Sequence, residues 1–261
     1  MIKILRVRNI DSFVESRRQK TSEKDRKIVQ SILNDVKRNG DSAVKKYERK
    51  FNGRKTSQLR VSEKEIKEAQ SKISREENHA LDRLAVKISL ESQGLMYDLE
   101  TLAKKKWKQG DPGLCDLKRL FIPIPSVGCY IPGGLARYPS SVAMSVMPAK
   151  AAGVKRIVVV SPPGRDGKID PLTIVAANMC GATEIYKVGG AQAIGALAYG
   201  TKSIPKVDKI VGPGGKFVSI AKSLVSDQTA IDMIAGPTEL GIIADASSDP
   251  ELVALDLISQ A

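Results

Sequence analysis

The strongest constraint on the fold is an alternation of short apolar runs and helical segments between residues 121 and 261. Each apolar run has the length of a strand, and glycine-rich turns separate several runs from the helical segment that follows. This alternation is typical of an α/β protein with a mostly parallel sheet covered by helices. The expected strands are Phe121–Tyr130, Arg156–Val160, Glu184–Val188, Lys209–Val211 and Leu240–Ala244, and the expected helices are Ser140–Ala152, Asp170–Cys180, Ala191–Tyr199 and Phe217–Val225.

The first 120 residues are polar and helical in pattern, with capping signals that mark where helices begin and end. A last helix opens at Asp249–Pro250 and still runs at Ala261, which favours a chain that is part of a longer protein. The expected N-terminal helices are one from Ser22 to Gly40, one capped by Asp41 and followed by Gly53, one opened by a Ser62–Glu65 capping box, and one over about 76–95.

The net charge of +13 raises the possibility of a nucleic-acid partner. The excess lies in residues 1–120, which hold 30 Lys and Arg against 18 Asp and Glu, a net of +12. There the bases are interleaved with acids at helical spacing, which favours a solvated helical surface. Only Lys104–Lys108 combines several bases with an aromatic, Trp107. We therefore expect no nucleic-acid partner, although a basic binding protein stays an open alternative.

Other residue types bound the chemistry and the compartment. Cys115, Cys129 and Cys180 follow no metal-ligand or disulfide spacing and are expected to be buried or half-buried thiols. The single histidine, His79, lies in a polar run and is expected on a helix surface. No run reaches the length of a membrane span and no secretory signal opens the chain, so we expect a cytoplasmic protein without a membrane partner.

Three glycine-rich loops each follow an expected strand and precede an expected helix: Tyr130–Gly134, Val188–Gln192 and Gly212–Lys216. A helix that begins after such a loop offers backbone N–H groups and a partial positive charge to a pyrophosphate or carboxylate. None of the three is a P-loop or a GxGxxG fingerprint, so each alone indicates only a turn. A fourth turn, Ala235–Glu239, has Asp232 just upstream and carries the hydroxyl of Thr238 and the carboxylate of Glu239.

Seven motifs, taken in order, resemble the histidinol dehydrogenase family. The resemblance is dense over residues 120–261. It is looser before residue 120, where Asn39–Ala43 and Phe51–Gly53 fit the family's early helices. The seven are Val127–Gly134, Tyr138–Met144, Pro148–Val154, Val188–Thr201, Pro205–Gly214, Ile231–Glu239 and Asp256–Ala261.

The resemblance implies an enzyme that oxidises L-histidinol to L-histidine in two NAD-dependent steps through a retained aldehyde. Zinc holds the substrate toward the nicotinamide, and a Glu-His pair supplies the acid–base chemistry. Carried over by motif, Tyr130, Gln192 and the backbone of Gly215 contact NAD, Thr238 contacts the substrate, and Gln260 is a zinc ligand that also lies at the substrate. Gly215 departs from the family, which commonly has asparagine there, and Thr238 replaces its usual serine.

The Glu-His pair and the other zinc ligands are expected beyond Ala261, so no acid–base residue of the family's site falls within this chain. We expect the isolated chain to be inactive and to bind zinc poorly. The full-length protein is expected to be a homodimer. The resemblance also implies two incomplete Rossmann-like domains with mostly parallel sheets: residues 26–129 plus 239–261, and residues 130–238, with a helical N-terminal segment, 1–25, outside both.

Two alternatives to a histidinol dehydrogenase stay open. The scaffold is shared with dehydrogenases of other alcohols, such as sulfonated diols, which competition between the two alcohols would distinguish. A non-catalytic basic protein that binds nucleic acid would lose affinity steeply as the salt concentration rises.

Overall fold

A computed structural model describes residues 9–17, 23–53, 58–104, 119–133, 137–164, 166–234 and 240–260 of the chain. Within these ranges, five strands form one parallel sheet in the order β3-β2-β1-β4-β5. The α/β class with a parallel sheet is therefore confirmed, while the division into two incomplete domains stays a prediction. The strands are β1 (Ser126–Tyr130), β2 (Arg156–Ser161), β3 (Glu184–Lys187), β4 (Lys209–Val211) and β5 (Ala230–Ile231).

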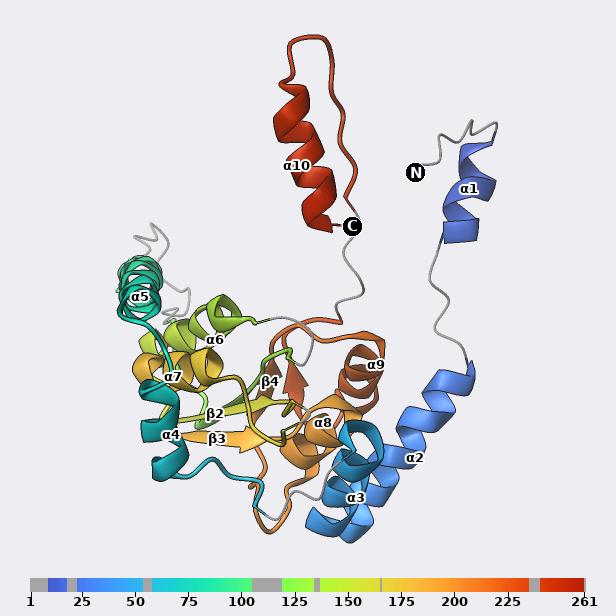
Figure 1. The fold of residues 1–261 in the computed structure, drawn as a ribbon, viewed down its shortest axis with the longest axis vertical. Helices are drawn as coiled ribbons and strands as arrows, with labels where there is room; N and C mark the ends of the chain where they lie inside the picture. Colours follow the sequence, from blue (N-terminus) through green and yellow to red (C-terminus); the bar gives the residue numbers. More distant parts are fainter. Residues whose placement is uncertain are drawn as a thin grey trace, which may run out of the picture.

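Helices cover both faces of the sheet and make a three-layer body (Figure 1). Side chains of β2 alternate between the two layers, because Val158 and Val160 face one core while Ile157 and Val159 face the other. The first core packs under α2 (Glu23–Asn39), α3 (Asp41–Asn52), α8 (Gly190–Tyr199) and α9 (Lys216–Val225). The second packs under α4 (Glu63–Gln70), α5 (Arg75–Lys104), α6 (Pro139–Ala151) and α7 (Pro171–Cys180).

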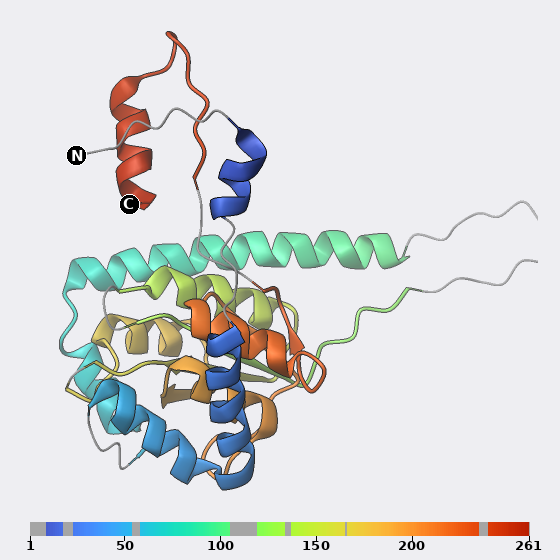
Figure 2. The same cartoon turned by 90° about the vertical axis from the view of Figure 1, so that its right-hand side faces the viewer.

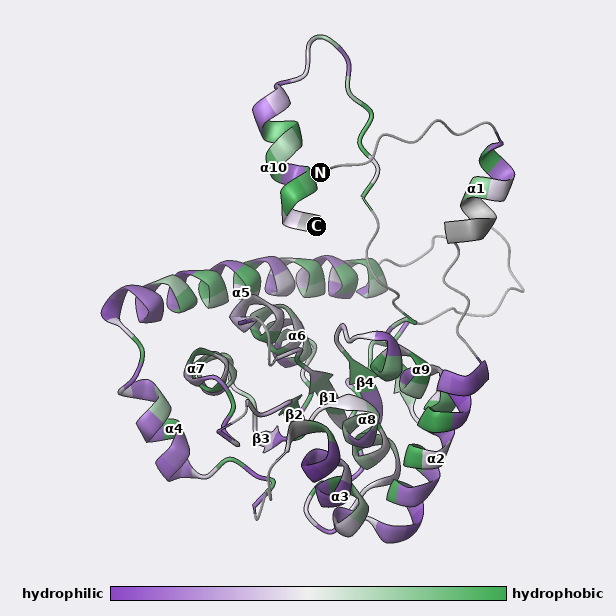
Figure 3. Cartoon of the chain, turned by 45° about the vertical axis from the view of Figure 1, so that its right-hand side comes forward, coloured by the Kyte–Doolittle hydropathy of each residue, from purple (hydrophilic) through white to green (hydrophobic). Residues whose placement is uncertain are grey.

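Two short helices stand away from this body: α1 (Ile10–Arg17) and α10 (Pro250–Gln260) (Figures 1 and 2). The far end of α5 also extends past the other layers (Figure 2). Residues of high hydropathy recur along α5 and α10 (Figure 3). Several of these residues are exposed, among them Leu90, Leu95, Leu255 and Ile258. No helix in the described ranges is long and apolar enough to cross a membrane.

The edge of β3 is paired with a segment that comes from the helical N-terminal half. Arg60 forms an antiparallel bridge with Tyr186, and the amides of Val61 and Lys187 donate to the carbonyls of Ile185 and Leu59. This segment leads directly into α4, whose predicted capping box is confirmed, since Ser62 and Glu65 bond each other reciprocally.

The segment Leu240–Ala244, expected as a strand, is irregular, and that prediction is wrong. Leu240 is 43% exposed and Ile243 is fully exposed, and no strand in the described ranges pairs with this segment. An apolar run becomes a strand only where another strand supplies its hydrogen bonds and side-chain contacts. The first expected strand begins late for the same reason, at Ser126, since residues 121–124 have no partner strand among the described residues.

Further differences concern ends of elements. Gly40, rather than Asp41, is the N-cap of α3, because the Asp41 carboxylate accepts hydrogen bonds from the amide and hydroxyl of Ser203 instead. Helix α5 is longer than expected, and α1 and β5 were not predicted. His79 is exposed on α5 and Cys129 and Cys180 are buried, as predicted. Cys115 lies outside the described residues, and so does most of Lys104–Lys108.

Candidate functional site

The candidate site lies along the carboxyl edge of the sheet, where the loops after β1, β3 and β4 meet. The chain runs from β1 outward through β2 to β3, then returns to place β4 on the other side of β1. The loops after β1 and β4 therefore diverge, and α/β proteins bind ligands at such a switch point. Figure 1 shows α8 and α9 beginning near this edge. The predicted site loops that begin at Tyr130, at the end of β1, and at Gly212, after β4, thus lie at the position that the topology favours.

Tyr130 is the last residue of β1 and is 5% exposed. Its hydroxyl accepts a hydrogen bond from the amide of Gly190, with 3.1 Å between Oη and N, and so ties the loop after β1 to the loop after β3. Burial raises the pKa of Tyr130, and the Gly190 amide only partly opposes this effect. Tyr130 is therefore a neutral phenol at physiological pH.

The loop between β3 and α8 needs both of its glycines. A Cβ at Gly189 would lie 2.4 Å from Cβ of Pro162, which follows β2. Gly190 has φ of +63°, and a Cβ there would lie 2.8 Å from Oε1 of Gln192. A side chain at either position would push the neighbouring loop away or strain the backbone. The close packing of this loop against Pro162, after β2, and Tyr130, at the end of β1, thus depends on this pair of glycines.

Gln192 lies in the first turn of α8 and is 2% exposed. Its Nε2 donates to Oε1 of Glu48, on α3, at 2.8 Å, and the amide of Gly189 donates to the same oxygen at 3.0 Å. Gln192 Oε1 is the one buried side-chain nitrogen or oxygen in the described ranges that has no hydrogen-bond partner. A buried acceptor without a donor costs about 1–3 kcal/mol, so it is a place where a ligand donor would be favoured.

The loop after β4 packs directly against the end of β1. Gly212 has φ of +108°, and a Cβ there would lie 2.1 Å from the carbonyl oxygen of Tyr130. The amide of Gly212 donates to Asp232 at 2.8 Å, and its carbonyl accepts from Nζ of Lys222 at 3.0 Å. Lys222 and Asp232 also form an ion pair. The backbone of this loop is therefore held at both polar groups of Gly212.

Asp232 follows β5 and is the acid of this ion pair. Desolvation on burial acts to raise its pKa, but the hydrogen bonds from Lys222, Met233 and Gly212 outweigh it, so the pKa of Asp232 is lowered. Asp232 is thus ionised at neutral pH and serves as a structural anchor for the loop.

Gly215 is the N-cap of α9 and makes no side-chain cap. Its φ of −66° suits any residue, and a Cβ there would meet nothing within 4 Å. The departure from asparagine therefore leaves open space and no strain. Gly189, the N-cap of α8, likewise makes no side-chain cap, and helix N-termini without a side-chain cap are suited to an anionic group.

The side chains of two other predicted site residues, Thr238 and Gln260, lie outside the described residues. Thr238 lies outside the described residues, and Gln260 ends α10, but its side chain is also outside them. No three His, Cys, Asp or Glu side chains gather into a metal site within the described ranges. The role of Gln260 as a zinc ligand stays a prediction.

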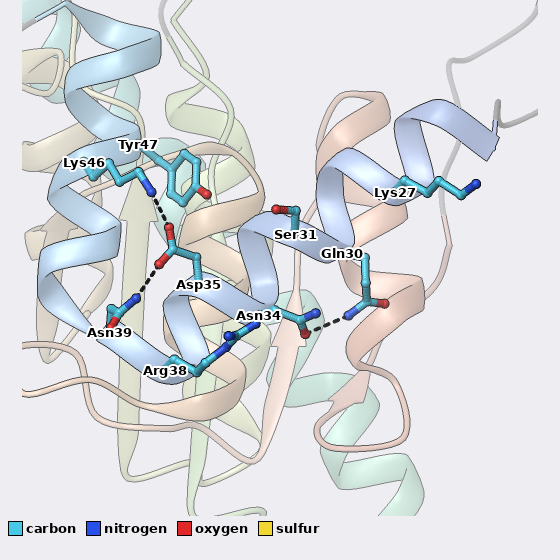
Figure 4. Close-up of a pocket in the computed structure, with 9 residues that line it drawn as sticks. All are labelled: Lys27, Gln30, Ser31, Asn34, Asp35, Arg38, Asn39, Lys46 and Tyr47. Carbon is cyan, nitrogen blue, oxygen red and sulfur yellow. Dashed lines mark hydrogen bonds and ion pairs between the residues drawn. The ribbon is translucent and has the colours of Figure 1, made fainter.

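A separate pocket of about 550 Å³ lies on the outer face of α2 and α3 (Figure 4). The carboxylate of Asp35 accepts from Lys46 at 2.7 Å and from Asn39 at 2.6 Å, and these bonds lower the pKa of Asp35 to about 2. Asp35 is thus already paired with residues of the pocket itself. The lining side chains all come from the surfaces of α2 and α3, so this pocket is separate from the carboxyl edge of the sheet. The lining residues are Lys27, Gln30, Ser31, Asn34, Asp35, Arg38, Asn39, Lys46 and Tyr47.

Sequence reasoning missed Glu48 and Lys222 altogether. Glu48 lies among the charged residues of α3, a pattern that usually marks a solvated helix face, yet it is 0% exposed. Lys222 lies in the mostly apolar α9 and is 2% exposed. A weak signal was available, because Glu48 falls four residues after the buried Val44, on the same face of α3. Asp232 was noted only as the acid upstream of the fourth turn.

The strand order, with helices on both faces of the sheet, defines a doubly wound α/β protein. The family model described as histidinol dehydrogenase matches residues 15–261. This chain belongs to the histidinol dehydrogenase family.

Individual relatives agree with this assignment. The chain is 46% identical over 240 residues to histidinol dehydrogenase of Bacillus licheniformis, covering 92% of this chain and 55% of that protein. It is 45% identical over 233 residues to that of Methanocaldococcus jannaschii, covering 89% and 53%. The crystal structure of histidinol dehydrogenase from Elizabethkingia anophelis superimposes with a TM-score of 0.85 at 36% identity, covering 97% of this chain and 57% of that one. The chain thus spans about half the length of the relatives it matches.

Proposed function

We propose that this chain, as the N-terminal part of a longer polypeptide, belongs to a zinc- and NAD-dependent enzyme that oxidises L-histidinol to L-histidine through histidinal. The observation that carries this proposal is the match of residues 15–261 to the family model, joined to the hydrogen bond that connects Tyr130 to the Val188–Gln192 loop at the carboxyl edge of the sheet. These two motifs lie some 60 residues apart in the chain, yet one hydrogen bond connects them.

Two features of the carboxyl edge suit a dinucleotide. Gln192 offers a buried amide oxygen that has no hydrogen-bond donor in the described ranges, while the other end of the same amide donates to Glu48. Gly215 leaves open space at the start of α9. When bound, NAD would accept the hydride that leaves the alcohol carbon. The residues of this chain would orient the dinucleotide and exclude water around it.

The described ranges do not by themselves fit zinc, so we assign no step to the metal here. Gln260 would supply one neutral oxygen ligand, and Thr238 would bring a hydroxyl to the substrate. The remaining ligands and the acid–base pair would come from residues after Ala261. The isolated 261-residue chain is then expected to be inactive, and the full-length polypeptide is expected to work as a homodimer.

The test compares the full-length polypeptide with the 261-residue chain. With zinc and L-histidinol, the full-length protein should form two NADH per histidinol, and the isolated chain should form none. A full-length protein that oxidises a sulfonated diol in preference to histidinol would keep the chemistry but change the substrate. NADH formation by the isolated chain would contradict the expected division of the site.

A further inference from the structure

Glu48 is a buried acid that no motif of the chain explains. It is 0% exposed, on the face of α3 that packs against α8. Removing a carboxylate from water is expensive, so such a group persists in a core only where hydrogen bonds or charges compensate for the loss of solvent. Here Oε1 receives two donors from the β3–α8 loop, the amide of Gly189 and Nε2 of Gln192. The acid therefore connects α3 to the loop of the candidate site.

The carboxylate decides which way the Gln192 amide faces. Oε1 of Glu48 acts as an acceptor for the Gly189 amide, so the NH₂ end of the Gln192 amide, which can donate, faces it. The amide oxygen, Oε1, then faces Gly190. A Cβ added at Gly190 would lie 2.8 Å from this oxygen. The oxygen is left as an acceptor without a partner in the described structure. If Glu48 were absent, nothing in these contacts would prevent the amide from turning over.

We propose that Glu48 is a positioning residue, which holds the Gln192 amide oxygen toward the bound dinucleotide and thereby sets the affinity of the site for NAD. The inference rests on the proposed function. The matching donor on the ligand is a ribose hydroxyl or an amide N–H, both of which NAD carries. Glu48 touches no ligand itself and acts through Gln192 and the Gly189 amide.

Glu184 provides a matched control for a merely structural acid. It is also mostly buried, and it pairs with Arg156 at 2.7 Å, but it begins β3, at the opposite edge of the sheet from the site. A change there should alter stability without altering the affinity for NAD. Glu48→Ala removes the shared acceptor, whereas Glu48→Gln keeps an oxygen that can accept both bonds.

The experiment measures KM for NAD, KM for histidinol, kcat and the thermal midpoint in the full-length protein. Glu48→Ala should raise KM for NAD by about tenfold, the effect of one lost hydrogen bond to a ligand, with KM for histidinol unchanged. Glu48→Gln should restore KM for NAD. Glu184→Gln should lower the thermal midpoint and leave KM for NAD unchanged. Glu48→Asp, too short to reach Gln192, replaces Glu48→Ala if that variant does not fold.

The double variant with Gln192→Leu makes the test specific. If Glu48 acts through Gln192, adding Glu48→Ala to Gln192→Leu should raise KM for NAD no further. Additive effects, an unchanged KM in Glu48→Ala, or an equal rise in Glu184→Gln would overturn the inference. Calorimetric titration of the same proteins with NAD separates the two proposals: a wild type that does not bind NAD overturns the proposed function, whereas equal binding by wild type and Glu48→Ala overturns the inference alone.

Discussion

The ammonium of Lys222 is buried beneath the loop after β4, where it bonds both the Asp232 carboxylate and the Gly212 carbonyl. Asp232 in turn accepts the Gly212 amide, so the lysine and the aspartate hold one glycine from both sides. This arrangement keeps Gly212 within van der Waals contact of the end of β1. The shape of the switch point therefore depends on a charge pair outside the loop itself.

Replacing Lys222 with methionine should destabilise the protein by about 3 kcal/mol, because the partly buried Asp232 carboxylate would keep its charge without its cationic partner. Urea denaturation of the purified chain measures the change. Lys216→Met is the matched control, since that lysine pairs with Asp25 but is 47% exposed, and it should cost less than about 1 kcal/mol. Equal losses in the two variants would contradict a special role for the buried pair.

The pair formed by Asp35 and Lys46 should make stability fall in acid. The folded-state pKa of Asp35 is about 2, below its ordinary value of 3.8, so its contribution is complete above pH 4 and is lost as the pH falls toward 2. Asp35→Asn should therefore be less stable than the wild type at pH 7, and the difference should shrink at pH 2. Unfolding followed by circular dichroism across this range tests the sign. High salt should reduce the difference, because Lys46 is 63% exposed.

Gly190→Ala should disturb both the backbone and Gln192. The positive φ alone costs about 1 kcal/mol for alanine, and the new Cβ would displace the amide oxygen. Gly167→Ala is the matched control, since Gly167 has φ of +78° with nothing within 4 Å of an added Cβ. Gly190→Ala should lower the thermal midpoint further than Gly167→Ala and raise KM for NAD in the full-length protein. Identical behaviour of the two variants would show that the contact with Gln192 does not matter.

Gly215→Asn should be tolerated and slightly stabilising. The position has an extended backbone and open space, and asparagine is a better N-cap than glycine by a few tenths of a kcal/mol. If the proposed function is right, the added amide should also lower KM for NAD by a few fold. Thermal melting and steady-state kinetics measure the two effects separately. A large loss of stability would mean that the loop is more tightly packed than its geometry indicates.

Local patterns alone determined much of the chain. The alternation of apolar runs and helical segments predicted the parallel sheet, and β4 was found at Lys209–Val211 as predicted. The Ser62–Glu65 capping box and the proline after Asp170 are local signals that act within one turn of helix. The resemblance named Tyr130, Gln192 and Gly215 as NAD contacts, and their roles toward NAD stay predictions, as do those of Thr238 and Gln260.

Only the tertiary structure decided which charged residues are buried and what they hold. Glu48 lies in a helix that local composition marks as solvated, whereas Lys222 lies in a mostly apolar one, and they bond groups 141 and 10 residues away along the chain. Leu240–Ala244 has the apolar composition of a strand, but no strand in the described part of the chain pairs with it. The physical reason is the same in each case, because the free energy of a buried charge or of an unpaired strand depends on groups that the fold brings near, and these do not appear in the surrounding sequence.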